Sequence, residues 1–342
     1  MIDLSAGQAA QWIPEQVRDD DVEGASVARR IIGWTLLAIG LLAAALLALF
    51  YTPDTDPAVM RAKYAPAPSR FVDVGGGLKV HLRDTGPRDA FPIVLLHGSN
   101  ASLHTWEPWA ERLETRYRVV RFDLPGHGLT GPTPSGRYDE DAFIDAIDRT
   151  VRALGLTRFA LGGNSMGGGF AWRYAAAHPE KVSALVLVDA SGAPYRDNVE
   201  TPLAFRIVQQ PVLRDIAAVM TPRSLIADGL RQSVSIKSVI TDPMIDLYWE
   251  LLRYPGNRAA TLARFGEPYS PATTAELARL TMPTLILWGA EDKLIPADNA
   301  RWFAQALRGA RVIVYPGIGH LPMEEAPDRS ASDVAAFLKT AL

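Results

Sequence analysis

Gly163-Asn164-Ser165-Met166-Gly167 is the stretch of this sequence that decides the fold. It follows the apolar run 159–161 and precedes residues 168–177, whose composition predicts a helix. A serine in a G-x-S-x-G pattern between a strand and a helix indicates a nucleophile elbow. The glycines are needed because side chains two positions from the serine would collide with the neighbouring strand or helix. We predict that Ser165 is a nucleophile at the positive end of a helix dipole; the alternative is a glycine-rich turn with an idle serine.

A serine nucleophile needs a base that removes its proton and an acid that orients the base. Of the six histidines, His320 lies in a loop directly after the last predicted strand. Asp292 follows the end of the strand before that one, and the order Ser165, Asp292, His320 is a known order for such triads. Asp189 also follows a strand and is the second candidate for the acid, while Glu291 is a weaker one.

The tetrahedral intermediate of acyl transfer needs backbone N–H donors around its oxyanion. The residue after the nucleophile, Met166, supplies the first expected donor. The second is expected in the loop after the strand 92–96, where we favour the N–H of Ser99 and keep Asn100 as its competitor.

From residue 70 onward, strands and helices alternate, which is typical of an α/β fold with a mostly parallel sheet covered on both faces. We predict an amphipathic helix over 139–154. The predicted strands are 71–74, 78–83, 92–96, 119–122, 159–162, 184–188, 284–288 and 312–315.

The alternation stops between Asp189 and Pro283, and residues 193–270 are predicted to form a helical cap between two parts of the core, 70–192 and 271–342. An insertion here would lie over the carboxyl edge of the sheet, where open α/β sheets bind ligands. A lid role and a packing role both remain open. The cap is rich in Phe, Met, Tyr and Trp, which favours an apolar acyl or alcohol group in the substrate.

Residues 31–50 carry no charge, and about twenty residues at about 1.5 Å each span the hydrocarbon core of a bilayer. We expect a retained single transmembrane anchor rather than a buried core helix or a cleaved signal peptide. Arg29 and Arg30 favour a cytoplasmic N-terminus, with the catalytic domain periplasmic or otherwise extracytoplasmic. Residues 1–30 form a polar segment whose first 28 residues are expected to be disordered, and 51–69 are expected to form a linker. Deleting 1–69 is therefore expected to preserve catalysis.

The composition of the chain argues against several classes of function. A net charge of −3 argues against nucleic acid as a partner, and the absence of cysteine excludes disulfides, thiolate metal sites and cysteine nucleophiles. Residues 126–131 fit G-x-G-x-x-G, but prolines follow at once, so no helix is available to hold a pyrophosphate. We expect no cofactor and no metal, since no metal-ligand spacing is present.

The chain from about residue 70 to 342 resembles the α/β-hydrolase fold family. Besides the elbow, the resemblance rests on His97-Gly98, on residues 121–128 and on Gly289-Ala290-Glu291-Asp292. It implies an eight-stranded, mostly parallel sheet with a helical cap after the sixth strand, and it supports Ser165, Asp292 and His320 as the triad. The glycine-rich loop that C–C bond hydrolases of this family carry after the third strand is replaced here by Ser99-Asn100-Ala101-Ser102.

Together these features predict a membrane-anchored serine hydrolase that cleaves carboxylic esters of small to medium apolar substrates through an acyl-enzyme. The expected partners are the small-molecule substrate and, through residues 31–50, the lipid bilayer. The alternatives are a C–C bond hydrolase of the meta-cleavage product type or a lactonase on the same triad. A non-catalytic binding protein on the same fold is the alternative from a different class.

Overall fold

The computed structural model describes residues 15–194, 210, 216 and 218–342. By contacts it divides into two compact units, Met1–Tyr51 and Thr52–Leu342. The larger unit is built on one eight-stranded sheet, and the described part of the smaller unit contains a single long helix. Each unit is described by itself.

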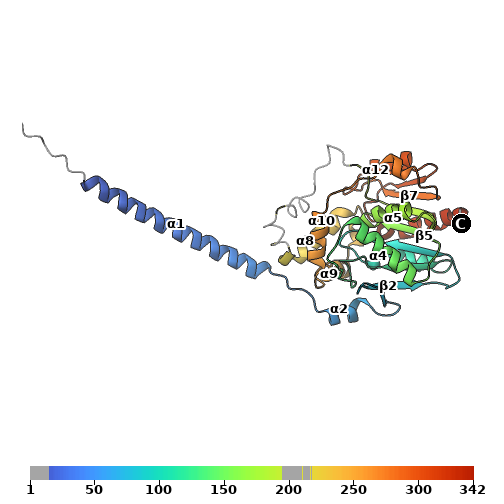
Figure 1. The fold of residues 1–342 in the computed structure, drawn as a ribbon, viewed down its shortest axis with the longest axis horizontal. Helices are drawn as coiled ribbons and strands as arrows, with labels where there is room; N and C mark the ends of the chain where they lie inside the picture. Colours follow the sequence, from blue (N-terminus) through green and yellow to red (C-terminus); the bar gives the residue numbers. More distant parts are fainter. Residues whose placement is uncertain (1–14, 195–209, 211–215, 217) are drawn as a thin grey trace, which may run out of the picture. The chain divides into compact units, whose positions relative to one another are not determined.

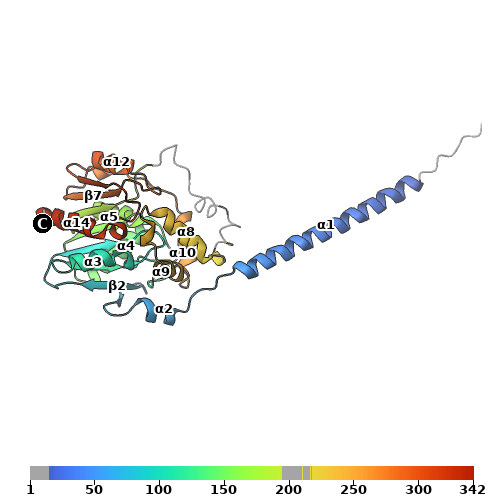
Figure 2. The ribbon, with the colours of Figure 1, turned by 180° about the vertical axis from the view of Figure 1, so that it is seen from behind.

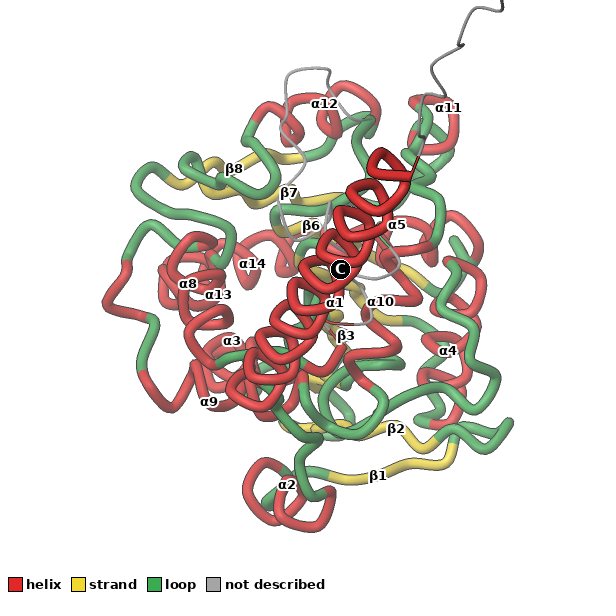
Figure 3. The backbone as a smooth tube through the Cα atoms, turned by 90° about the vertical axis from the view of Figure 1, so that its left-hand side faces the viewer, coloured by secondary structure: helices red, strands yellow, loops and turns green. Residues whose placement is uncertain are grey.

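The sheet has the strand order β1-β2-β4-β3-β5-β6-β7-β8. Strands β3 to β8 are parallel to one another, whereas β1 and β2 form an antiparallel hairpin whose β2 pairs antiparallel with β4 at one edge. Figure 3 shows β1 and β2 at one edge of the sheet and β7 and β8 toward the other. The strands are β1 (Arg70–Asp73), β2 (Lys79–Thr85), β3 (Pro92–Leu96), β4 (Arg118–Phe122), β5 (Phe159–Asn164), β6 (Val182–Val188), β7 (Thr284–Gly289) and β8 (Arg311–Tyr315). The predicted eight-stranded, mostly parallel sheet is confirmed.

Helices cover both faces of this sheet, and each face has its own apolar core. One core contains side chains of α4 (Glu140–Ala153), α5 (Met166–Ala177) and α12 (Asp298–Ala306). The other contains side chains of α3 (Glu107–Leu113) and α14 (Pro327–Ala341). Figures 1 and 2 show these two groups from opposite sides. Covering both faces explains why the inner strands are apolar throughout rather than alternating.

Helical structure replaces the alternation between β6 and β7, as predicted for the cap. The described helices of this insertion are α8 (Arg223–Ser233), η2 (Lys237–Val239), α9 (Asp242–Leu252), α10 (Asn257–Gly266) and α11 (Thr274–Leu277). Helices α8, α9 and α10 group together at one end of the sheet (Figure 1). Three apolar residues expected in the cap, Phe205, Val212 and Leu213, lie outside the described residues.

The segment expected to be a linker, 51–69, differs from that expectation, because Thr52 onward belongs to the larger unit. It contains a helix, α2 (Pro57–Tyr64), whose first turn is capped by the Asp56 side chain. The Thr55 N–H donates to the Arg253 carbonyl at 2.9 Å, and Arg258 donates to the Asp54 carboxylate at 2.6 Å. The composition of this segment predicts a linker, but its polar groups pair with cap residues about 200 positions away in sequence, which local composition does not reveal.

In the smaller unit, helix α1 (Glu15–Phe50) begins well before the uncharged run. The disorder expected for residues 1–28 is therefore not seen over 15–28. Within α1, Gly24–Phe50 is 27 residues long with a mean hydropathy of 2.4, long and apolar enough to cross a membrane. A membrane anchor and a signal sequence both meet this criterion.

Candidate active site

The turn between β5 and α5 has the geometry predicted for an elbow. Ser165 adopts φ 54° and ψ −119°, a conformation that L-residues rarely adopt. A Cβ at Gly163 would lie 2.3 Å from the Gly167 carbonyl oxygen, and a Cβ at Gly167 would lie 2.2 Å from the Leu96 carbonyl oxygen. Both glycines are thus required by backbone contacts on either side of the serine, and Ser165 is held where α5 begins.

His320 and Asp292 are brought together in the loops after β8 and β7. The His320 Nδ1 atom lies 2.7 Å from Asp292 Oδ2, and the two residues are 4% and 6% exposed. The other carboxylate oxygen of Asp292 accepts the N–H groups of Leu294 and Ile295 at 2.8 and 3.0 Å. These two donors fix the carboxylate, and the carboxylate in turn fixes the imidazole, leaving Nε2 as the nitrogen available for proton transfer.

Asn164, the residue before the nucleophile, fixes the histidine loop against the elbow. Its side-chain amide donates to the His320 carbonyl at 3.1 Å and to the Val188 carbonyl at 3.2 Å. Among the described residues, no hydrogen bond joins the Ser165 hydroxyl to His320. Such bonds are often long before substrate binds. The triad of Ser165, Asp292 and His320 therefore stays a prediction, of which the structure displays the acid–base half.

The predicted oxyanion donors flank the same serine. Met166 is the first residue of α5, directly after the nucleophile. The loop after β3 comes close on the other side, since a Cβ on Gly98 would lie 3.2 Å from Ser165 Cβ. Ser99 and Asn100 follow Gly98, and Asn100 has a positive φ of 56°. Their positions are compatible with either residue as the second donor, so the choice of Ser99 stays a prediction.

Asp189, the second candidate for the triad acid, does not take the His320 hydrogen bond. It is fully buried, and its Oδ1 accepts the Gly289 N–H at 2.9 Å. Ligand atoms of Asp189, Asp292 and His320 lie within 4.8 Å of one another, close enough to surround a metal ion. However, the 2.7 Å separation of His320 Nδ1 and Asp292 Oδ2 is a hydrogen-bond distance, so these two atoms bind each other directly.

Two glutamates near the histidine were not singled out from the sequence. Glu325 accepts the N–H groups of Ser235 and Gly319 at 2.7 and 2.9 Å, which joins the cap to the histidine loop. Glu324 accepts hydrogen bonds from Thr105 of the core and Tyr248 of the cap. Burial raises the pKa of Glu324 to about 7. Ser235 lies 90 positions from Glu325 in the sequence, and Thr105 and Tyr248 lie 219 and 76 positions from Glu324. No local sequence pattern could therefore have revealed these contacts.

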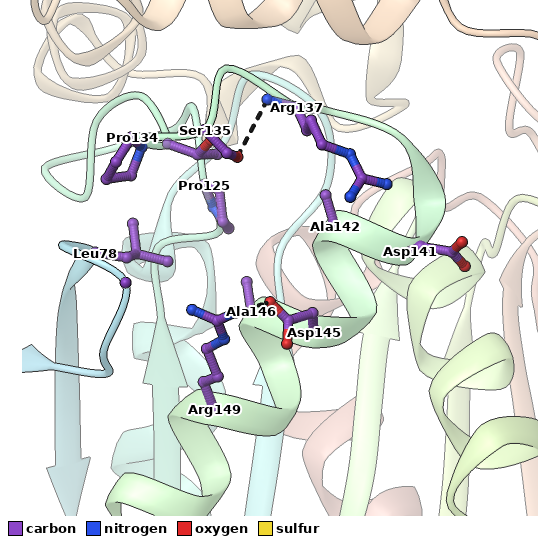
Figure 4. A pocket seen from close by; sticks show the side chains of 12 residues that line it. Leu78, Pro125, Pro134, Ser135, Arg137, Asp141, Ala142, Asp145, Ala146 and Arg149 are labelled. Atoms are coloured by element: carbon purple, nitrogen blue, oxygen red, sulfur yellow. Dashed lines mark hydrogen bonds and ion pairs between the residues drawn. The ribbon is translucent and has the colours of Figure 1, made fainter.

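A separate pocket of about 330 Å³ lies beside α4 and contains none of the predicted site residues. Figure 4 shows Asp141, Asp145 and Arg149 on α4, Arg137 on the loop before it, and Pro125 and Pro134 on the other side. Arg149 there pairs with Asp145 at 2.7 Å, and Arg137 pairs with Asp139 at 2.8 Å. Because these charges already have partners, the pocket adds no site to the one around Ser165.

Comparisons with known proteins agree with this geometry. The family model described as "Alpha/beta hydrolase family" matches residues 93–333. The chain is 27% identical over 281 residues to a 2-hydroxymuconate semialdehyde hydrolase of Pseudomonas sp. (strain CF600), covering 78% of this chain and 93% of that protein. It is 26% identical over 260 residues to monoacylglycerol lipase abhd6-B of Xenopus laevis, covering 72% and 75%.

Among solved structures, the chain is similar to a membrane phospholipase A described as a bacterial virulence factor. The match has a TM-score of 0.70 and 26% identity, and it covers 92% of this chain and 99% of that one. With the family model matched over most of its length, the chain belongs to the alpha/beta hydrolase family, and it is a hydrolase.

Proposed function

We propose that this member of the alpha/beta hydrolase family is a membrane-anchored serine hydrolase that cleaves carboxylic esters of small to medium apolar substrates. The observation that carries the proposal is the buried His320–Asp292 pair, 2.7 Å apart, next to a strained Ser165 at the start of α5. A buried imidazole that a carboxylate orients, in the loop beside the elbow, is the arrangement that activates a serine hydroxyl.

In the proposed reaction, Ser165 attacks the acyl carbonyl while His320 Nε2 takes its proton. The Ser99 and Met166 amides stabilise the oxyanion, and His320 then gives the proton to the leaving alcohol. Water, deprotonated by the same nitrogen, attacks the acyl-enzyme and releases the acid. Asp292 stays ionised throughout and holds the imidazole in one tautomer.

The substrate class is inferred from the cap and from the relatives. Two of the reported relatives are named as a monoacylglycerol lipase and a membrane phospholipase A, and both names denote ester hydrolysis of lipids. Partly buried Met244, Leu247 and Tyr248 of α9 add apolar surface on the cap. Each extra buried methylene of an acyl chain contributes about 0.8 kcal/mol, or roughly fourfold in kcat/KM, until the space is filled.

The name of the Pseudomonas relative favours a second candidate, hydrolysis of a C–C bond in a vinylogous diketone. A panel of chromogenic esters of graded chain length, assayed beside such a diketone, separates the two. Ester hydrolysis predicts a rate that peaks at medium chains, with the diketone a poor substrate. Rapid cleavage of the diketone with poor ester turnover would contradict ester hydrolysis and support C–C hydrolysis instead. No turnover of either, with no labelling of Ser165 by a fluorophosphonate, would favour a non-catalytic binding protein.

The anchor is proposed from residues 31–50, within the apolar helix Gly24–Phe50, with Arg29 and Arg30 on the cytoplasmic side and the catalytic unit on the other. The likeness to a membrane phospholipase A, which covers 92% of this chain, supports it. Membrane fractionation and protease protection of the full chain provide the test. Full-length protein in the soluble fraction contradicts the anchor, and digestion only after the cytoplasmic face is opened contradicts the orientation.

A further inference from the structure

Asp189 lies beside the Asp292–His320 pair of the proposed site. It follows β6, is 0% exposed and has a φ of 44°, which is unusual for an aspartate. Its own N–H donates to the Leu287 carbonyl at 3.0 Å, so the strained backbone is held by β7. Its carboxyl group, that of Asp292 and the His320 ring contribute atoms that all lie within 4.8 Å of one another. The proposed reaction assigns this second carboxyl group no step.

The two carboxyl groups differ in the donors that surround them. Asp292 accepts two backbone N–H groups at one oxygen and His320 at the other. Asp189 accepts one, the Gly289 N–H at Oδ1, while its Oδ2 is buried without a partner in the described part of the chain. Two buried carboxylates this close repel each other, so one of them retains a proton. The group with fewer donors gains least from ionisation and therefore keeps it.

The surrounding charges act in the same direction. Burial, and then the neighbouring Asp292 carboxylate, raise the pKa of Asp189 well above its usual range, with a further contribution from Glu325. The Gly289 N–H lowers the pKa of Asp189, but it is a single opposing contact. With His320 engaged by Asp292, no cation in the described surroundings is paired with Asp189.

We propose that Asp189 is a positioning residue that remains a neutral acid at neutral pH and donates its Oδ2 proton to the Asp292 carboxylate. This gives the orphaned Oδ2 atom a partner and gives Asp292 a further donor, without a second negative charge beside the base. The proposal rests on the proposed function, because it assigns Asp292 as the acid of the triad.

The test compares Asp189→Asn with Asp189→Leu. The asparagine amide is neutral and can still donate to Asp292, so kcat/KM should stay within a few-fold of wild type. Leucine has similar size and no donor, so kcat should fall roughly 10- to 100-fold, the value of one hydrogen bond to a charged group. Without that donor the charge of Asp292 attracts the imidazolium more strongly, so the acidic limb of the kcat/KM profile should move to higher pH for leucine alone.

Infrared difference spectroscopy gives a readout that a merely structural role would not change. At neutral pH, in a Glu324→Gln background that removes the carboxyl group with a pKa of about 7, the enzyme should show the C=O band of a protonated carboxyl group, and adding Asp189→Asn should remove it. A band that is unchanged in Asp189→Asn, or an asparagine variant as damaged as the leucine variant, overturns the proposal. If the leucine variant does not fold, the band and the asparagine kinetics still decide. The band needs no turnover, so an active Ser165→Ala enzyme would sink the serine-hydrolase mechanism without touching this result.

Discussion

The guanidinium of Arg264, on cap helix α10, donates a hydrogen bond from Nη2 to the Ser99 hydroxyl, in the loop after β3, over 2.9 Å. One turn earlier on the same helix, Thr261 donates to the Asn100 side chain at 2.9 Å. Burial lowers the pKa of Arg264 to about 10, which still leaves it charged at neutral pH. The cap therefore contacts the loop after β3 directly, and the position of the cap is coupled to the residues expected to bind the oxyanion.

Arg264→Met should lower kcat by roughly tenfold with little change in the fold, because a displaced oxyanion donor is costly at the transition state. Ser99→Ala removes the same hydrogen bond while leaving the Ser99 amide in place, which makes it the matched control. The two changes should not be additive in a double-mutant cycle. Additive losses would mean that the arginine acts on catalysis by another route.

Ser165→Ala should abolish ester turnover, with a loss on the order of 10⁴- to 10⁶-fold in kcat, since the three groups of a triad act as a unit. The fold should persist, because the elbow is held by the glycine contacts rather than by the hydroxyl. Circular dichroism and the melting temperature serve as the control. A purified alanine variant with near wild-type activity would refute the serine mechanism.

Sequence patterns identified the sheet and the position of the elbow because both depend on local rules. Apolar runs predict buried strands, and the glycines around Ser165 follow from two backbone contacts. The approach of Asp292 to His320 followed from their places after neighbouring strands. The docking of residues 52–64 and the contacts of Arg264 and Glu325 were beyond prediction, because they join side chains whose nearness is set only by the finished fold.

The Glu324 contact with Tyr248 and Thr105 predicts a pH-dependent junction between cap and core. A carboxyl group whose pKa is about 7 when folded, against 4.5 as its ordinary value, favours the protonated form in the folded state. Its contribution to stability is therefore fully present below about pH 4.5 and is lost as pH rises through 7. Glu324→Gln should retain a neutral partner and flatten the fall in melting temperature between pH 5 and about 8. If melting temperature falls with pH equally steeply in the variant, groups other than Glu324 cause the loss of stability.

The point at which the chain is truncated to remove the anchor should determine the stability of the remaining enzyme. Cutting after Tyr51 leaves the larger unit whole, whereas deleting residues 1–69 also removes α2 and the contacts of residues 52–55 with the cap. Met60 of α2 is 5% exposed and packs with Leu129, Leu251 and Tyr254, and losing a buried methionine alone costs about 2–5 kcal/mol.

The shorter truncation should therefore keep the melting temperature and ester kcat/KM of the full chain, while the longer one should melt several degrees lower and lose activity through a loosened cap. Met60→Ala in the chain that begins at Thr52 is the matched control, and it should reproduce part of the loss in melting temperature. None of the predicted catalytic residues lies in 52–69. An effect on kcat would therefore arise from a displaced cap, because Arg258 on α10 donates a hydrogen bond to Asp54. Equal melting temperatures and rates for the two truncations would support the linker predicted from the sequence, and would mean that the observed contacts contribute little to stability.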